Sequence, residues 1–149
     1  MIRYLIDTNI ISELTKARPT AGVRTFLASL TASQLYLSVI SLGEIERGIE
    51  RLPASEQRAQ LRGWLLNTVR PRYAGRILDI DEGVMSSWAL MVVATGRTPG
   101  QLPALDALIA ATALHHGLTV VTRNTKDFKI FQVPVLNPFS PPTSDEASL

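Results

Sequence analysis

The hydrophobic positions of this 149-residue chain alternate between short apolar runs and longer segments with helical spacing. Short β-branched runs are typical of buried strands, whereas apolar residues that recur every three or four positions predict amphipathic helices. The runs that predict strands span residues 2–6, 35–40, 76–78, 118–122 and 133–137. The helical patterns between them span residues 10–14, 21–30, 42–52, 54–70, 82–95 and 104–116.

Strands that alternate with helices of this length predict the α/β class: a three-layer α/β/α fold with a central, mostly parallel sheet and helices on both faces. We find no internal repeat and no linker that would divide the chain. Residues 1–139 are therefore expected to form one domain. Residues 140–149 are rich in Pro, Ser and Asp, which predicts a flexible C-terminal tail.

The composition indicates the cellular compartment. The chain has no cysteine, which excludes disulfides and thiolate metal sites and favours a cytoplasmic protein. The apolar run at the N-terminus is interrupted by Asp7 and is too short for a signal peptide or a membrane span. No membrane association is expected.

Arginine makes up twelve of the fifteen basic residues, and the net charge is +2. A guanidinium group offers a planar donor fork that suits phosphate, but a solvated surface with ion pairs is the more ordinary use of arginine. Arg47 and Arg51 lie one and two turns after Glu44 on the same helical face. They could contact phosphate at the rim of a cleft, or they could pair with Glu50 and neighbouring acids.

Two carboxylates stand directly after predicted strands, where ligands bind in parallel sheets. Asp7 follows the first strand and Glu44 the second. Each also has a structural interpretation: Asp7 could cap the next helix, and Glu44 forms the capping-box pattern S-x-x-E with Ser41.

Asp106 is harder to explain as a structural residue. The predicted helix around it is apolar on every side except for Asp106 itself and Thr112. Such a helix is expected to be buried, and a buried carboxylate is costly unless a cation or several donors meet it. We interpret Asp106 as a functional residue.

Asp127 lies in the segment TRNTKDF, directly after the strand at 118–122. Thr122 and Asn124 add further oxygen-bearing side chains at the same edge. A polar loop in which Asn124 and Asp127 form turns would explain the same residues.

A parallel topology would bring all four acids to one end of the sheet, where they could not all stay ionised without a cation. Ligation by oxygen alone favours Mg²⁺ or Mn²⁺. One or two such ions can orient a water for in-line attack on a phosphodiester. The pattern thus predicts a metal-dependent phosphate-transfer site.

The motifs LIDTNIISEL, SLGEIERGIERL, LPALDALIAATALHHGLTVVTRNTKDF and VPVLNPF together resemble a PIN domain of the VapC and FitB type. The resemblance covers the chain up to Phe139. It implies a PIN-like nuclease domain: a Mg²⁺- or Mn²⁺-dependent endoribonuclease that is the toxin of a toxin–antitoxin pair. It also implies a homodimer and a higher-order complex with a co-encoded antitoxin protein.

The resemblance assigns roles to individual residues. Asp7, Glu44 and Asp106 match the family's first three acids, which hold the metal. Asn9, Ser41 and Thr122 match polar residues that support them. The fourth acid of many members stands two residues after this threonine, where the chain has Asn124. Asp127 could replace that acid, or the site could use three acids, so the number of metal ions stays open.

Two other functions fit the same pattern less well. A PIN-like domain could use its acidic crevice only to bind a partner, although the intact set of acids argues against this. A metal-dependent nuclease could also act on DNA. The segment D-T-N after the first strand provides neither the D-x-D of haloacid dehalogenase phosphatases nor the acidic pair of response-regulator receivers.

Overall fold

The computed structural model describes residues 1–140 and contains a sheet of five parallel strands in the order β3-β2-β1-β4-β5. The strands are β1 (Tyr4–Ile6), β2 (Leu35–Ser38), β3 (Ile77–Leu78), β4 (Thr119–Val121) and β5 (Val135–Leu136). The predicted α/β class with a parallel sheet is confirmed.

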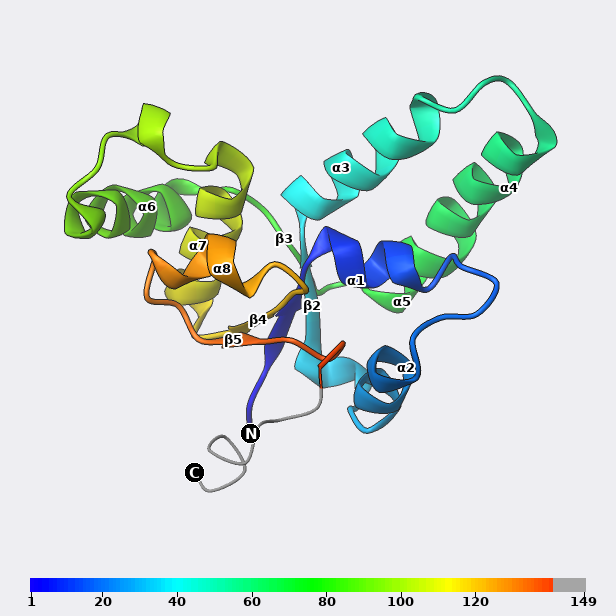
Figure 1. The fold of residues 1–149 in the computed structure, drawn as a ribbon, viewed down its shortest axis with the longest axis horizontal. Helices are drawn as coiled ribbons and strands as arrows, with labels where there is room; N and C mark the ends of the chain where they lie inside the picture. The colour runs from blue at the N-terminus through cyan, green and yellow to red at the C-terminus, as the bar shows by residue number, and fades with distance from the viewer. Residues whose placement is uncertain (141–149) are drawn as a thin grey trace.

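Helices cover both faces of the sheet (Figure 1). The α-helices are α1 (Thr8–Glu13), α2 (Ala21–Ala28), α3 (Val39–Glu50), α4 (Glu56–Trp64), α5 (Arg70–Arg72), α6 (Glu82–Thr95), α7 (Ala104–His116) and α8 (Thr125–Lys129). Short 3₁₀ turns η1 (Ala32–Gln34) and η3 (Pro99–Gln101) and the π-helical segment η2 (Leu65–Val69) complete the described part. The first five α-helices lie on one face, and α6, α7 and α8 lie on the other.

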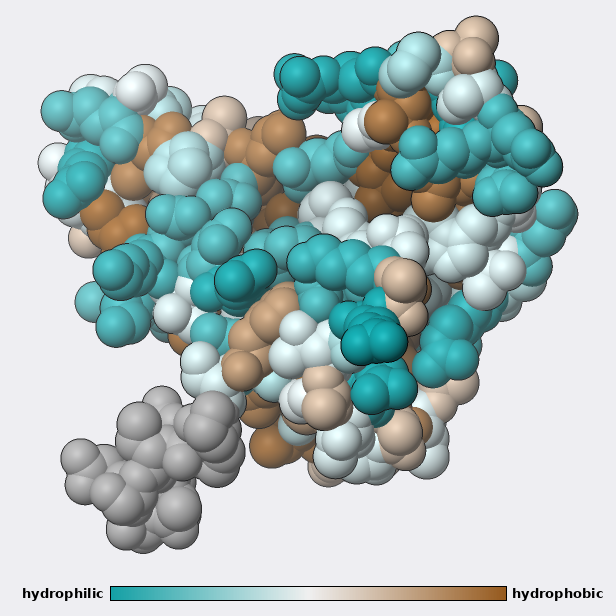
Figure 2. Space-filling view, turned by 45° about the vertical axis from the view of Figure 1, so that its right-hand side comes forward, coloured by the Kyte–Doolittle hydropathy of each residue, from teal (hydrophilic) through white to brown (hydrophobic). Residues whose placement is uncertain are grey.

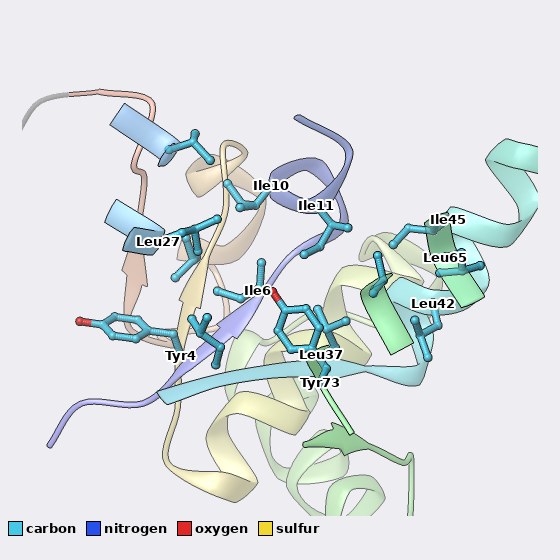
Figure 3. Close-up of a cluster of buried hydrophobic side chains, with 14 of the residues drawn as sticks. Tyr4, Ile6, Ile10, Ile11, Leu27, Leu37, Leu42, Ile45, Leu65 and Tyr73 are labelled. Carbon is cyan, nitrogen blue, oxygen red and sulfur yellow. The ribbon is translucent and has the colours of Figure 1, made fainter. Parts of the chain in front are cut away.

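The alternation of side chains along β1 divides the core into two clusters. Tyr4 and Ile6 point into the cluster under α1 and α3, whereas Leu5 points into the cluster under α6 and α7. Figure 3 shows the first cluster, in which Ile6 and Leu37 of the sheet meet Ile11 of α1. Burying both faces of β1 explains why its sequence is continuously apolar rather than alternating.

The order of the strands creates a switch point between β1 and β4. The chain builds β1, β2 and β3 outward in one direction and then returns to place β4 and β5 on the other side of β1. Ligands of open α/β sheets bind beyond the carboxyl ends of the strands at such a point. The backbone N–H of Asp7, just past β1, donates to the carbonyl of Val121 at the end of β4, at 2.9 Å.

Three predicted segments differ from the structure. Val39 and Ile40 were expected to end the second strand, but they form the first turn of α3, because the Ser38 hydroxyl accepts a hydrogen bond from the Ile40 N–H at 3.0 Å and caps the helix there. The predicted helix at 54–70 is α4 followed by η2 and α5. The segment after β4, where the sequence predicts no helix, contains the helix α8.

The helix α7 is less buried than its apolar sequence predicts. Leu105 is 47% exposed and Leu114 is 39% exposed, while Ile109 between them is fully buried. The helix therefore keeps an apolar edge on the surface, and its hydrophobic sequence alone does not place every side chain inside. Asp106 is half-buried rather than enclosed.

The space-filling view shows a mostly hydrophilic face, with apolar surface visible beneath the arm formed by α3 and α4 (Figure 2). No helix in residues 1–140 combines the length and the apolar character needed to cross a bilayer. Apart from Ser140, the predicted flexible tail lies outside the described residues.

Two helical glycines are expected to respond to alanine in opposite ways. A β-carbon at Gly48 of α3 would meet open space, so Gly48→Ala should raise the free energy of unfolding by roughly 0.5–1 kcal/mol through a lower entropy of the unfolded chain. A β-carbon at Gly22 of α2 would clash with the backbone oxygen of Pro138, so Gly22→Ala should lower it by roughly 1–3 kcal/mol. Urea denaturation measures the free energy of unfolding of both variants. Equal changes in the two variants would contradict this prediction.

Candidate active site

Asp7 lies at the switch point and is held from two sides. It is the N-cap of α1, and its Oδ1 accepts a hydrogen bond from the Thr8 N–H at 2.8 Å. Its Oδ2 accepts one from the Thr122 hydroxyl at 2.8 Å, across from β1 to β4. The side chain is only 4% exposed, and this burial raises the pKa of Asp7 although both hydrogen bonds oppose the shift. Asp7 thus caps a helix, as one interpretation of the sequence expected, and also presents a carboxylate to the site.

Asn9 connects the same elements through its side-chain amide. Its Nδ2 lies 3.3 Å from Oδ2 of Asp7 and 3.2 Å from the hydroxyl of Thr122, and its Oδ1 accepts a hydrogen bond from the Arg123 N–H at 3.1 Å. The start of α1 is therefore fixed to the chain that leaves β4. This arrangement places Asn9 and Thr122 in contact with Asp7, where supporting residues were expected.

Glu44 projects from α3 toward α1. Its Oε1 accepts a hydrogen bond from the Thr8 hydroxyl at 2.9 Å, which leaves its other carboxylate oxygen free of hydrogen bonds within residues 1–140. Thr8 is not among the site residues that the sequence predicts. Its position in the segment D-T-N, between two candidate site residues, is the signal that could have identified it.

Ser41 and Glu44 do not form the capping box that was the alternative interpretation of their pattern. Ser38 caps α3, so Ser41 and Glu44 both lie inside the helix, one turn apart. The Ser41 hydroxyl is buried and has no hydrogen-bond partner among the described residues. A buried hydroxyl without a partner is uncommon and indicates a place for a water molecule or another ligand.

Asp106 lies in the first turn of α7. Burial and the negative charges of Asp7, Asp127 and Glu44 raise its pKa from 3.8 to about 6. The partial positive charge at the start of α7 offsets this only in part. The three other acids therefore lie close enough to act on Asp106, as the parallel topology predicted.

Asp127 and Asn124 belong to α8 and its start, not to a loop. Both side chains are exposed, and Asp127 stands in the first turn of the helix. The negative charge of Asp127 acts on both Asp7 and Asp106, whereas the Asn124 backbone N–H donates to the Thr122 hydroxyl at 3.0 Å. The structure thus brings Asp127 toward the other acids, while Asn124 contacts a supporting residue through its backbone.

Arg47 and Arg51 are exposed along α3 and form no ion pair within residues 1–140. Glu50, the partner that the sequence offered them, instead pairs with Arg62 of α4 at 2.6 Å. Both arginines therefore keep their charges available on the helix that carries Glu44.

The donor set suits a hard divalent cation. Every candidate ligand is an oxygen. Burial and the repulsion by three other acids both raise the pKa of Asp106, and a bound cation would relieve the repulsion. Within residues 1–140, no group of three or more histidine, aspartate or glutamate side chains lies close enough together to hold a metal ion. Mg²⁺ commonly takes only one or two carboxylates and keeps several waters, so an open cluster of acids is compatible with it.

A family model of the PIN domain matches residues 4–132. The fold is similar to that of FitAcB from Neisseria gonorrhoeae, with a TM-score of 0.85, 36% identity and coverage of 93% of this chain and 99% of that one. It is also similar to FitAB bound to a DNA fragment, with a TM-score of 0.86, 34% identity and coverage of 95% and 99%. The class defined by fold and family is thus that of PIN domains.

The relatives narrow this class. The VapC ribonuclease Y4jK of Sinorhizobium fredii is 36% identical over 92% of this chain and 98% of its own length. The toxin FitB of Neisseria gonorrhoeae is 38% identical over 91% and 97%. The chain therefore belongs to the PIN domain family, within the group of VapC and FitB toxins of toxin–antitoxin systems.

Proposed function

We propose that the protein is a Mg²⁺- or Mn²⁺-dependent endoribonuclease that acts as the toxin of a toxin–antitoxin pair. The observation that carries this proposal is the acidic cluster of Asp7, Glu44, Asp106 and Asp127 at the β1/β4 switch point, where burial and the three other carboxylates raise the pKa of Asp106 to about 6. An assembly of like charges is costly for the fold unless a cation binds there. The relatives named as ribonucleases support RNA as the substrate.

Asp7, Glu44 and Asp106 would hold the cation, and Asp127 would add charge or position a water from the start of α8. Thr122, Asn9 and Thr8 keep two of these carboxylates in fixed orientations through hydrogen bonds of 2.8–3.3 Å. A bound divalent ion would supply the charge that offsets the phosphodiester's negative oxygens and would orient the attacking water. Rigid carboxylates reduce the reorganisation needed when the substrate arrives.

We further propose a co-encoded antitoxin as the partner, a homodimer as the functional unit, and the cytoplasm as the compartment. Solved relatives include FitAB and VapBC complexes, which supports an antitoxin. An antitoxin that bears a basic side chain would fit the acidic cluster and keep the toxin inactive. The absence of cysteine supports a reducing compartment.

The metal requirement can be tested on purified protein freed of any partner. Cleavage of a labelled single-stranded RNA should occur with Mg²⁺ or Mn²⁺ and stop with excess EDTA, because all proposed ligands are oxygens. Mn²⁺ should also raise the melting temperature, since it relieves repulsion only in the folded state. Undiminished cleavage in EDTA would contradict the metal mechanism.

A non-catalytic binding module would give a different result. It would melt at a higher temperature with Mn²⁺ but would not cleave RNA at any metal concentration. A DNA nuclease would cleave single-stranded DNA of the same sequence faster than the RNA. Cleavage and melting assays on the same purified protein therefore distinguish a ribonuclease, a binding module and a DNA nuclease.

A further inference from the structure

Arg123 begins the segment that leaves the acidic cluster beyond β4. It directly follows Thr122, whose hydroxyl donates to Asp7 at 2.8 Å. Its own backbone N–H donates to Oδ1 of Asn9 at 3.1 Å. The backbone of Arg123 is thus held on both sides of the switch point, one residue away from a contact with a proposed metal ligand.

The side chain of Arg123 is also held. Its guanidinium carbon lies 4.9 Å from the centre of the Phe139 ring, within the range of a cation–π contact. Phe139 is half-buried against the core, and its N–H donates to the side chain of Asn137 at 2.9 Å in the turn after β5. An arginine that rests on a fixed ring loses less conformational entropy when it binds a ligand.

The charge of Arg123 is available. The residue is exposed, and its guanidinium forms neither an ion pair nor a hydrogen bond with any side chain in the part of the chain that the structure describes. Arg62 and Arg70, by contrast, are paired with Glu50 and Glu46. A guanidinium that stacks through one face keeps its N–H edges free to donate hydrogen bonds to an anion.

The position of Arg123 complements that of the arginines on α3. Arg123 follows β4 and Phe139 follows β5, so this pair lies on the β5 side of the switch point. Arg47 and Arg51 follow β2, on the other side of β1. A polyanion that crosses this edge of the sheet would meet positive charge on both sides of the acids, which would otherwise repel it.

We propose that Arg123 binds a phosphate of the RNA strand next to the acidic cluster and that Phe139 positions its guanidinium for this contact. The inference rests on the proposed ribonuclease function and adds a substrate-binding residue to it. Phosphate is the favoured ligand because the strand brings one at every nucleotide and because the bidentate N–H edge of arginine matches it.

The test measures binding of a fluorescently labelled single-stranded RNA to the full chain carrying Asp106→Asn, which serves as the parent because this change is expected to suppress cleavage. Arg123→Gln in this background should weaken binding about tenfold at low salt and reduce the slope of log K against log salt by roughly 0.7, the value for one phosphate contact on a single strand. Phe139→Leu should weaken binding less and leave the slope unchanged, because the charge remains.

Arg72→Gln is the matched control. Arg72 is an exposed arginine at the end of α5, shortly before β3 begins, and so lies near the opposite edge of the sheet. The Arg72→Gln variant should bind RNA as tightly as the parent and with the same salt slope. Thermal melts confirm that each variant is folded.

The possible failures are distinguishable. If the parent itself does not bind RNA, the proposed ribonuclease function is wrong, and the role of Arg123 falls with it. If the parent binds and Arg123→Gln matches Arg72→Gln, the function stands and the inference about Arg123 is wrong. Weaker binding with an unchanged salt slope would also overturn it, because no phosphate contact would have been lost.

Discussion

Replacing Asp106 with asparagine is expected to lower RNA cleavage by at least about a hundredfold while making the folded protein more stable at neutral pH. The change removes a proposed metal ligand, and this explains the loss of activity. It also removes a charge that burial and three neighbouring acids disfavour. If Asp106 were purely structural, the variant would keep its cleavage activity and lose stability.

The gain in stability should depend on pH in a defined way. The pKa of Asp106 is raised from 3.8 to about 6 in the folded protein, so ionisation costs stability as the pH rises through this interval. Below about pH 4 the carboxyl is protonated in both the folded and the unfolded protein, so Asp106→Asn does not change the free energy of unfolding. Above about pH 6 the gain in the free energy of unfolding is complete. It amounts to roughly 1–2 kcal/mol, after allowance for the partial exposure of the side chain.

Urea denaturation of both proteins from pH 3.5 to 8, without divalent metal, measures this difference. Glu56→Gln is a suitable control, because Glu56 is an exposed acid on α4, and its free energy of unfolding should change by less than about 0.5 kcal/mol. An Asp106→Asn protein that is less stable at pH 7 and still cleaves RNA would identify Asp106 as a structural residue.

Asp127→Asn is expected to reduce cleavage at least tenfold while RNA binding persists. The charge of Asp127 acts on Asp7 and Asp106, which makes it the better candidate for the fourth acid. Asn124→Ala should cost less, because the contact of Asn124 with Thr122 is made by its backbone, which alanine keeps.

Cleavage rates measured against Mn²⁺ concentration separate the two positions. Asn124→Asp completes the comparison, because an added carboxylate at that position would tighten metal binding only if residue 124 faces the ion. If Asn124→Ala lowers cleavage more than Asp127→Asn does, Asn124 rather than Asp127 provides the fourth ligand. Near-wild-type curves for all three variants would leave a site built on Asp7, Glu44 and Asp106.

Much of the fold could be predicted because its signals are local. The helix α6 has the predicted bounds, Glu82–Thr95, since Asp81 caps its start and Gly96 ends it in the left-handed conformation. Gly117 ends α7 in the same way, directly after the predicted helical range 104–116. Each signal lies within one helical turn of the boundary that it sets, so a single sequence is sufficient to read it.

The predictions failed where a local pattern allowed two outcomes. Val39 and Ile40 are as suitable for a buried strand as for a buried helical turn, and the competition was decided by the hydroxyl of Ser38. The segment after β4 has the polar composition of a loop, yet α8 forms there because Phe128 is buried in the core on the α6 side of the sheet. Tertiary packing overrides composition in such segments.

For the site, the sequence determined which acids exist and that each stands beside a strand or a helix start. Their mutual distances depend on strand order, and the placement of β4 next to β1 brings Thr122 onto Asp7 across 115 positions of the chain. The contact of Thr8 with Glu44, the raised pKa of Asp106 and the stacking of Arg123 on Phe139 arise in the same way. Only the tertiary structure decides them, because electrostatic and hydrogen-bond energies depend on separation in space, which separation in sequence does not fix.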